Sequence, residues 1–183
     1  MIYVALLRGI NVGGNNKIDM KLLKLTFERV GMKSVKTYIN SGNIIFINDG
    51  LSKTKIVQVL EKAIYLDFGL QIKIVVRSFN DFKLIMKALP ASWKNDQDMK
   101  SDVLFLWDDI DDELVLQKVV VKPEIDKVIY VTGAILWSVD TINVTKSGKA
   151  KLIGTVLYKK MTIRNVNTTR KIYELMQSTV SCN

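Results

Sequence analysis

The chain has 183 residues, 48% of them hydrophobic, and a formal net charge of +9. This length and composition predict a soluble globular protein of one domain or two small ones. It contains no histidine, which excludes imidazole-based triads and metal sites. The only cysteine, Cys182, excludes internal disulfides and cysteine metal clusters. We therefore expect a cytoplasmic protein without a metal or cofactor.

No membrane association is expected from the apolar segments. The apolar runs fall far short of the ~20 residues that a membrane-spanning helix needs. The first run, at residues 2–7, meets Arg8 almost at once and lacks the flanking features of a signal peptide. We interpret it as a buried strand.

The positive charge is unevenly distributed along the chain. Residues 1–90 hold 14 Lys and Arg against 6 Asp and Glu, residues 91–126 hold 4 against 10, and residues 127–183 hold 9 against 2. We interpret the acidic block as a solvated surface. The two basic blocks fit either solvated helix faces or a surface for anionic partners.

The first part of the chain predicts four strands and two helices. Apolar runs predict strands at 2–7, 35–39, 44–47 and 72–76, and helical periodicity predicts helices at 20–30 and 53–68. Asp19 and Ser52 are suitable helix N-caps, and Gly31 and Gly69 are suitable ends. The order β-α-β-β-α-β is that of the ferredoxin-like, or split βαβ, plan.

The remainder predicts a second set of elements in the same order. A helix at 79–89 stopped by Pro90 and a polar stretch at 92–101 come first. Strands at 103–107, 127–131, 135–139 and 161–164 and helices at 109–121, 149–158 and 168–176 follow, with Asn167 as the N-cap of the last. We predict an α+β fold of two tandem ferredoxin-like subdomains, repeated in topology rather than in residues. The division is 1–78, a linking helix and loop at 79–101, and 102–183 with an extra C-terminal helix.

Two polar loops form the main candidate site: RGINVGGNN at 8–16 and NSGN at 40–43. In a split βαβ unit the first two strands run parallel, with the third between them, so both loops lie on one sheet edge. Glycines allow close approach of a ligand, and the following helix N-terminus favours an anion. The candidate ligand-binding residues are Arg8, Asn11, Gly13, Gly14, Asn15, Asn40, Ser41 and Asn43.

A structural explanation of these loops has similar weight, because glycine and asparagine also serve left-handed turns and loop hydrogen bonds. The spacing is neither that of a P-loop nor that of a dinucleotide-binding loop. A second polar cluster, TIRNVNTTR at 162–170, adds Arg164 and Asn165 as candidates for phosphate contacts.

Three motifs together resemble a known family. RGINVGGNNKIDM at 8–20, YINSGN at 38–43 and TIRNVNT at 162–168 are similar to those of the bacterial domain of unknown function family 1697. The resemblance implies two ferredoxin-like subdomains and a Ser-Lys pair before the last strand, to which Thr145 and Lys146 correspond. It implies no activity, cofactor or catalytic residue.

Three functions remain open at this point. The first is binding of a phosphorylated small molecule or nucleic acid at the 8–16 and 40–43 loops. The second is a histidine-free, metal-free enzyme in which Lys17, Lys146 or Ser41 acts as nucleophile or base and Arg8 holds an oxyanion. The third is a structural or protein-interaction module in which the loops only set the path of the chain.

Overall fold

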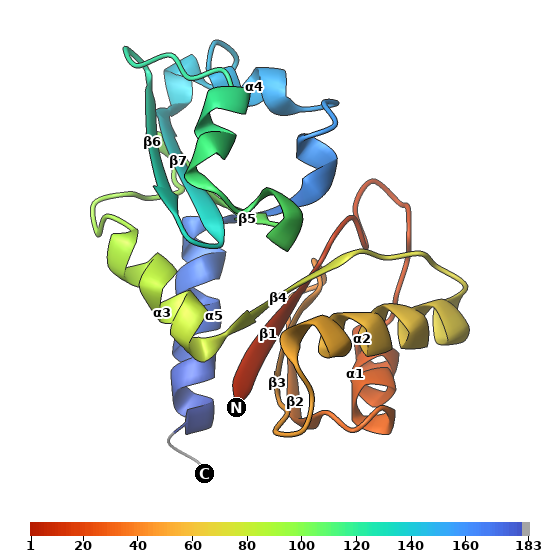
Figure 1. The fold of residues 1–183 in the computed structure, drawn as a ribbon. Coiled ribbons are helices and arrows are strands. Elements are labelled where there is room, and N and C mark those ends of the chain that lie inside the picture. The colour runs from red at the N-terminus through yellow and green to blue at the C-terminus, as the bar shows by residue number, and fades with distance from the viewer. Residues whose placement is uncertain (181–183) are drawn as a thin grey trace. The chain divides into compact units, whose positions relative to one another are not determined.

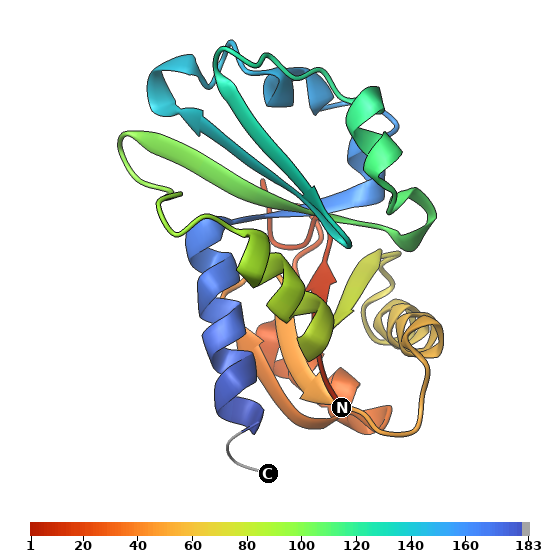
Figure 2. The ribbon, with the colours of Figure 1, turned by 60° about the vertical axis from the view of Figure 1, so that its left-hand side comes forward.

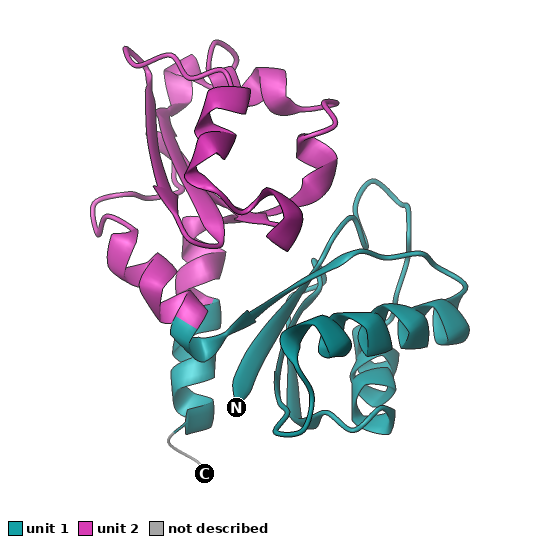
Figure 3. Ribbon diagram, viewed as in Figure 1, with its two compact units in different colours: residues 1–80, 172–183 teal, residues 81–171 magenta. Residues whose placement is uncertain are grey.

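A computed structural model describes residues 1–180 as two compact units (Figure 3). The first unit comprises residues 1–80 together with the chain from Ile172 onward, and the second comprises residues 81–171. Helix α5, Val166–Val180, contributes to both. Cys182 lies outside the described residues, and the predicted division at residues 78 and 101 stays a prediction about which segments fold independently.

The first unit is a four-stranded antiparallel sheet with two long helices (Figure 1). The strand order is β2-β3-β1-β4, so β1 and β2 run parallel with β3 between them, as predicted. The bounds are β1 Ile2–Leu7, α1 Met20–Arg29, β2 Lys33–Tyr38, β3 Asn43–Ile47, α2 Lys53–Phe68 and β4 Ile74–Ser78.

The helix ends of this unit lie where the sequence predicts them. The Asp19 carboxylate accepts the N–H groups of Lys21 and Leu22 at the start of α1. Ser52 caps α2, and left-handed Gly69 ends it. Both helices cover one face of the sheet, where their apolar side chains join those of the strands in a single core (Figure 1).

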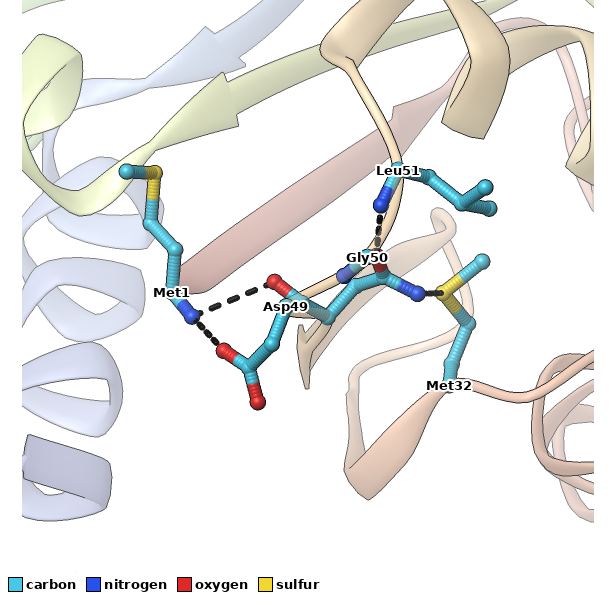
Figure 4. A network of polar contacts seen from close by, with 6 residues as sticks. Met1, Met32, Asp49, Gly50 and Leu51 are labelled. Carbon is cyan, nitrogen blue, oxygen red and sulfur yellow. Dashed lines mark hydrogen bonds and ion pairs between the residues drawn. The ribbon is translucent and has the colours of Figure 1, made fainter.

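The N-terminus of β1 is fastened to the turn after β3 (Figure 4). The Met1 ammonium donates to the Asn48 carbonyl at 3.1 Å and pairs with Asp49. The Asn48 side chain accepts the N–H groups of Gly50 and Leu51. This network fixes the end of the sheet at which β1 begins. The candidate loops lie at the opposite end of the sheet, where β1 ends.

The second unit is built on another four-stranded antiparallel sheet, of order β6-β7-β5-β8. Its core includes Trp137 and residues from the short helices that follow β5 and β7. The bounds are α3 Phe79–Ala88, which begins in the first unit, β5 Met99–Leu106, η1 Asp108–Ile110, η2 Glu113–Lys118, β6 Asp126–Val131, β7 Ala134–Asp140, η3 Thr141–Asn143, α4 Gly148–Leu152, η4 Tyr158–Lys160 and β8 Met161–Asn165.

Two predicted helices of this unit are wrong or too long. The helix predicted at 109–121 is replaced by the short 3-10 helices η1 and η2, and residues 119–121 are not helical. Between η1 and η2 the Asp111 carboxylate accepts the Gly133 N–H and the Tyr130 hydroxyl, which turns the chain. The predicted helix at 149–158 ends at Leu152 and gives way to turns at Gly154, which has a φ of 87°. None of the helices in residues 1–180 has both the length and the hydropathy required to cross a bilayer.

Equivalent strands of the two sheets pair in an equivalent register. Val4 on β1 lies opposite Arg77 on β4 and Ile45 on β3. Val103 on β5 lies in the same way opposite Arg164 on β8 and Leu136 on β7. A correspondence between residues of the two units therefore exists that the sequence pattern did not show.

Candidate functional site

The RGINVGGNN loop is a tight hairpin. The Asn15 N–H donates to the Val12 carbonyl at 3.0 Å, and the Asn11 N–H donates to the Asn16 carbonyl at 3.2 Å. The two central residues, Gly13 and Gly14, have φ values of 59° and 80°. Positive φ at both central positions is what a type I′ hairpin turn requires. The glycine pair therefore has a structural role in the turn, and both glycines are exposed at its tip.

Asn11 joins the hairpin to its neighbours. Its Nδ2 donates to the Ile18 carbonyl at 3.0 Å and to the Asn40 carbonyl at 2.9 Å. Its Oδ1 accepts the Ile18 N–H at 2.9 Å. The predicted adjacency of the 8–16 and 40–43 loops is confirmed, because this side chain bridges them.

Two further asparagines also bond within the loops. Asn16 Nδ2 donates to the Gly9 carbonyl at 2.9 Å. Buried Asn43 donates from Nδ2 to the Tyr38 carbonyl at 3.0 Å and to the Ser41 hydroxyl at 3.1 Å. These amides therefore hold the loops in shape, and the structural explanation applies to Asn11, Asn16 and Asn43.

Gly42 is a necessary residue that the sequence reasoning did not single out. It is buried, has a φ of 78°, and accepts the Leu7 N–H at 2.8 Å. A Cβ at this position would lie 2.8 Å from both Leu7 Cβ and Ile10 Cδ1. The sequence feature that could have indicated this role is that Gly42 is the only glycine in the four-residue connection between β2 and β3.

Left-handed backbone is concentrated at this edge. Of the four non-glycine residues with positive φ in residues 1–180, two belong to residues 8–16, and a third, Ile39, directly precedes residues 40–43 and is counted with this edge. Ile39 is the most unusual of them, because it is β-branched, has a φ of 49° and is 48% exposed. The left-handed residues of the edge are Gly9, Asn11, Gly13, Gly14, Asn16, Ile39 and Gly42.

A shallow polar depression of about 370 Å³ lies between the hairpin and α1. Asp19 is among its lining residues, and its carboxylate already takes the first N–H groups of α1. The expectation that this helix N-terminus favours an anion stays a prediction, and the N–H groups of Lys21 and Leu22 already have Asp19 as their acceptor. The lining residues are Asn11, Gly14, Lys17, Ile18, Asp19, Met20 and Asn40.

The remaining candidates of the first unit differ in their exposure, and of them Lys17 and Asn40 line this depression. The side chains of Asn15, Lys17 and Asn40 are exposed. Arg8 is half-buried, and its N–H donates to the Lys73 carbonyl at 3.0 Å. The structure thus brings together the candidates from the two loops, although only some of them face solvent.

Arg164 and Asn165 belong to the second unit and have structural partners there. Buried Arg164 donates from Nη1 to the Thr162 hydroxyl at 3.0 Å and to the Ile163 carbonyl at 2.8 Å, and burial lowers the pKa of Arg164 to about 10. Asn165 Oδ1 accepts the Thr168 N–H at 2.8 Å. The prediction of Asn167 as the N-cap is wrong, because Asn165 fills that role and α5 begins at Val166.

A buried carboxylate in the second unit was missed by the sequence reasoning. Asp126 Oδ1 accepts from Trp137 Nε1 and from the Ser147 hydroxyl, and Oδ2 accepts the N–H groups of Lys122 and Gly148. Burial raises the pKa of Asp126, but these donors outweigh it, so the net pKa is lowered. In the chain the five residues are spread over 27 positions, so only the fold reveals the cluster.

The cluster gives no sign of a metal site. In residues 1–180 no three acidic, cysteine or histidine side chains are grouped so that they could hold a metal ion. All four donors to Asp126 come from the protein itself. Its evident role is to fasten β6, β7 and the start of α4.

Known proteins confirm the resemblance drawn from the motifs. No curated protein matches the chain. The conserved bacterial protein SP0830 from Streptococcus pneumoniae is similar in structure, with a TM-score of 0.81 and 30% identity over 96% of this chain and 98% of that one. The model of a protein family of unknown function, DUF1697, matches residues 1–137. Because that match covers most of the chain, the protein belongs to the DUF1697 family.

Proposed function

We propose that the protein binds a phosphorylated or anionic ligand, a nucleotide or nucleic acid, at the edge formed by residues 8–16 and 40–43. The concentration of left-handed residues at this edge carries the proposal. In residues other than glycine a left-handed conformation costs free energy, and such strain is found mostly where function requires a fixed shape. Ile39 supports this most directly, because it is β-branched, has a φ of 49° and leaves about half of its surface exposed, so that packing covers it only in part.

The ligand would meet the groups that the loops do not use internally. The N–H groups of Gly13 and Gly14 have no acceptor within residues 1–180 and lie at the exposed hairpin tip. Lys17 and Asn40 add one cation and one amide from the lining of the depression, and exposed Asn15 adds a second amide next to Gly14 in the chain. Residues 1–80 hold 12 Lys and Arg against 5 Asp and Glu, which favours an anion.

The alternative of an enzyme has less support from this geometry. It requires Lys17 or Ser41 to be enclosed beside Arg8, but Lys17 is exposed and the Ser41 hydroxyl accepts a hydrogen bond from Asn43. Lys146 lies in the second unit. The structural alternative accounts for Asn11, Asn16, Gly42 and Asn43, and these residues are therefore excluded from the proposed contact surface.

We also propose that each unit is a ferredoxin-like subdomain. The order of the four strands supports this for both sheets. In the second unit the 3-10 helices η1 and η2 and the short α4 occupy the chain positions where the first unit has α1 and α2. A bacterial cytoplasmic location agrees with the single cysteine and with the bacterial origin of the similar structure.

The test measures binding to the full chain in low salt. Thermal shifts with ATP, GTP, AMP and inorganic phosphate detect a small ligand, and fluorescence anisotropy with single- and double-stranded DNA and RNA detects a nucleic acid. The triple variant Asn15→Ala, Lys17→Ala, Asn40→Ala is expected to weaken binding about tenfold or more while the fold is kept.

The control is a triple variant of exposed residues on α2: Lys55→Ala, Gln58→Ala, Lys62→Ala. It removes one more positive charge than the test variant but leaves the edge intact, so its binding should change less. Absence of binding to every probe, or equal weakening in both variants, would overturn the proposal.

A further inference from the structure

Large apolar side chains are unusually exposed in residues 141–160 of the second unit. Ile142 is 84% exposed, Val156 is 74% exposed and Ile153 is 66% exposed. The first two are the most exposed large hydrophobic residues of the described chain. Isolated exposed aliphatic residues are ordinary, but three in one short segment indicate contact with something apolar.

The same segment is basic. Residues 141–160 contain five lysines and no Asp or Glu. Lys149 pairs with Asp102, and Lys160 pairs with Asp109. The other three, Lys146, Lys151 and Lys159, form no ion pair within residues 1–180. All three are exposed. The segment therefore offers aliphatic side chains together with uncompensated positive charge.

These residues belong to one continuous stretch of the second unit. Residues 141–160 comprise η3, α4, η4 and the turns between them. Figures 1 and 2 both show this pale-blue to blue stretch bordering the second unit at the end that carries α4. The exposed side chains thus lie on short, irregular elements rather than on a groove-forming helix pair.

We propose that residues 141–160 form a docking surface for an anionic lipid bilayer. Aliphatic side chains that enter the acyl boundary and lysines that contact anionic headgroups are the two parts of interfacial membrane binding. A single-stranded nucleic acid would favour aromatic stacking platforms, and Tyr158, the only aromatic residue here, is half-buried. The apolar runs from which no membrane association was expected are too short only for a spanning helix, which adsorption of this kind does not need. The inference does not rest on the function proposed for the first unit.

The test is sedimentation of the full chain with vesicles of phosphatidylcholine, with and without phosphatidylglycerol. We expect binding only to the anionic vesicles, decreasing with salt. At about fivefold per lysine near the surface, Lys146→Ala, Lys151→Ala, Lys159→Ala should weaken binding by about two orders of magnitude. The double variant Ile153→Ser, Val156→Ser keeps every lysine, and it should nevertheless bind anionic vesicles less. Electrostatic attraction alone does not explain such a loss.

Matched controls come from the same unit. Lys83→Ala, Lys87→Ala, Lys94→Ala removes three exposed lysines elsewhere, and Leu84→Ser, Leu114→Ser removes two exposed leucines. Both should retain binding, as should the edge variant at Asn15, Lys17 and Asn40. The proposal is overturned if the protein does not bind anionic vesicles, if the control variants lose as much binding, or if Ile153→Ser, Val156→Ser binds fully. It is also overturned if DNA, added at a phosphate concentration equal to that of the lipid, displaces the protein from the vesicles.

Discussion

At the scale of single residues, Asn11 shows how one amide can hold a loop that looks like a ligand site. Its side chain makes four hydrogen bonds, one of them to the Met20 sulfur, and these join the hairpin, the entry to α1 and the β2–β3 turn. Each hydrogen bond contributes about 1 kcal/mol to the free energy of unfolding, and leaving a buried partner without its hydrogen bond costs more than that. Asn11 also tolerates its φ of 54° better than most residues do.

We predict that Asn11→Ala lowers the stability of the first unit by about 3 kcal/mol. All three tryptophans, Trp93, Trp107 and Trp137, belong to the second unit, so their fluorescence does not report on the first. Hydrogen exchange of peptides from β1 and β3 is therefore the measurement. Asn15→Ala is the control, since it keeps the turn hydrogen bond of its main chain. Unchanged exchange in Asn11→Ala would contradict the structural role.

At the same scale, Asp126 makes the second unit sensitive to acid. Its folded-state pKa is lowered, so its carboxylate stabilises the unit above the ordinary pKa range of aspartate. That contribution is lost as the pH falls through the folded-state pKa. We predict that tryptophan fluorescence shows a falling urea midpoint below about pH 4.

Asp126→Asn should lower the midpoint at neutral pH and weaken its dependence on acid. The amide cannot accept all four donors that the carboxylate accepts. Asp140→Asn, at an exposed aspartate, is the matched control. An Asp126→Asn curve parallel to that of the unchanged protein at all pH values would show that other groups cause the acid sensitivity.

At the scale of elements, α4 depends on a close approach of two main chains. A Cβ on Gly148 would lie 1.7 Å from the Val120 carbonyl oxygen, and main chain cannot yield as a flexible side chain does. We predict that Gly148→Ala destabilises the second unit by more than about 3 kcal/mol. Gly154→Ala, in the same unit, where a Cβ meets nothing within 4 Å and only the φ of 87° opposes the substitution, should lower the tryptophan urea midpoint by much less. Equal midpoints for both variants would contradict this packing.

Elements were predictable from the sequence where local signals decide them. Asp19, Ser52 and Gly69 bound α1 and α2 by hydrogen bonds and a left-handed turn within a few residues of each other. The helix predicted at 109–121 was wrong because contacts with distant residues determine the structure there. The Asp111 carboxylate accepts hydrogen bonds from Gly133 and Tyr130, which are 22 and 19 positions away. The β-branched residues 119–121 weaken helix formation further.

The candidate edge was predictable for a similar reason. Strand order alone placed residues 8–16 beside residues 40–43. Which asparagine side chains face solvent depends on loop geometry at the level of single hydrogen bonds, as with Asn11 inward and Asn40 outward. Sequence could not separate the residues that build the edge from those that remain available to a ligand.

At the scale of the whole molecule, α5 links the stability of the first unit to the end of the chain. Ile172 and Met176 are buried and belong to that unit. Tyr173 stacks on Phe79 with ring centroids 5.6 Å apart, and Thr179 accepts from Lys36 Nζ at 3.2 Å. A unit whose sheet is complete by Ser78 thus also requires a helix made almost a hundred residues later.

We predict that Met176→Ala destabilises the first unit by about 2–5 kcal/mol, the range for removing a buried methionine side chain. Hydrogen exchange in peptides of β1–β4 should become faster, while the urea midpoint of tryptophan fluorescence stays within error, because the substituted residue lies outside residues 81–171. Ser178→Ala, two positions later on the exposed face of α5, should change neither. An equal shift of the tryptophan midpoint in Met176→Ala would show instead that the two units unfold as one cooperative structure.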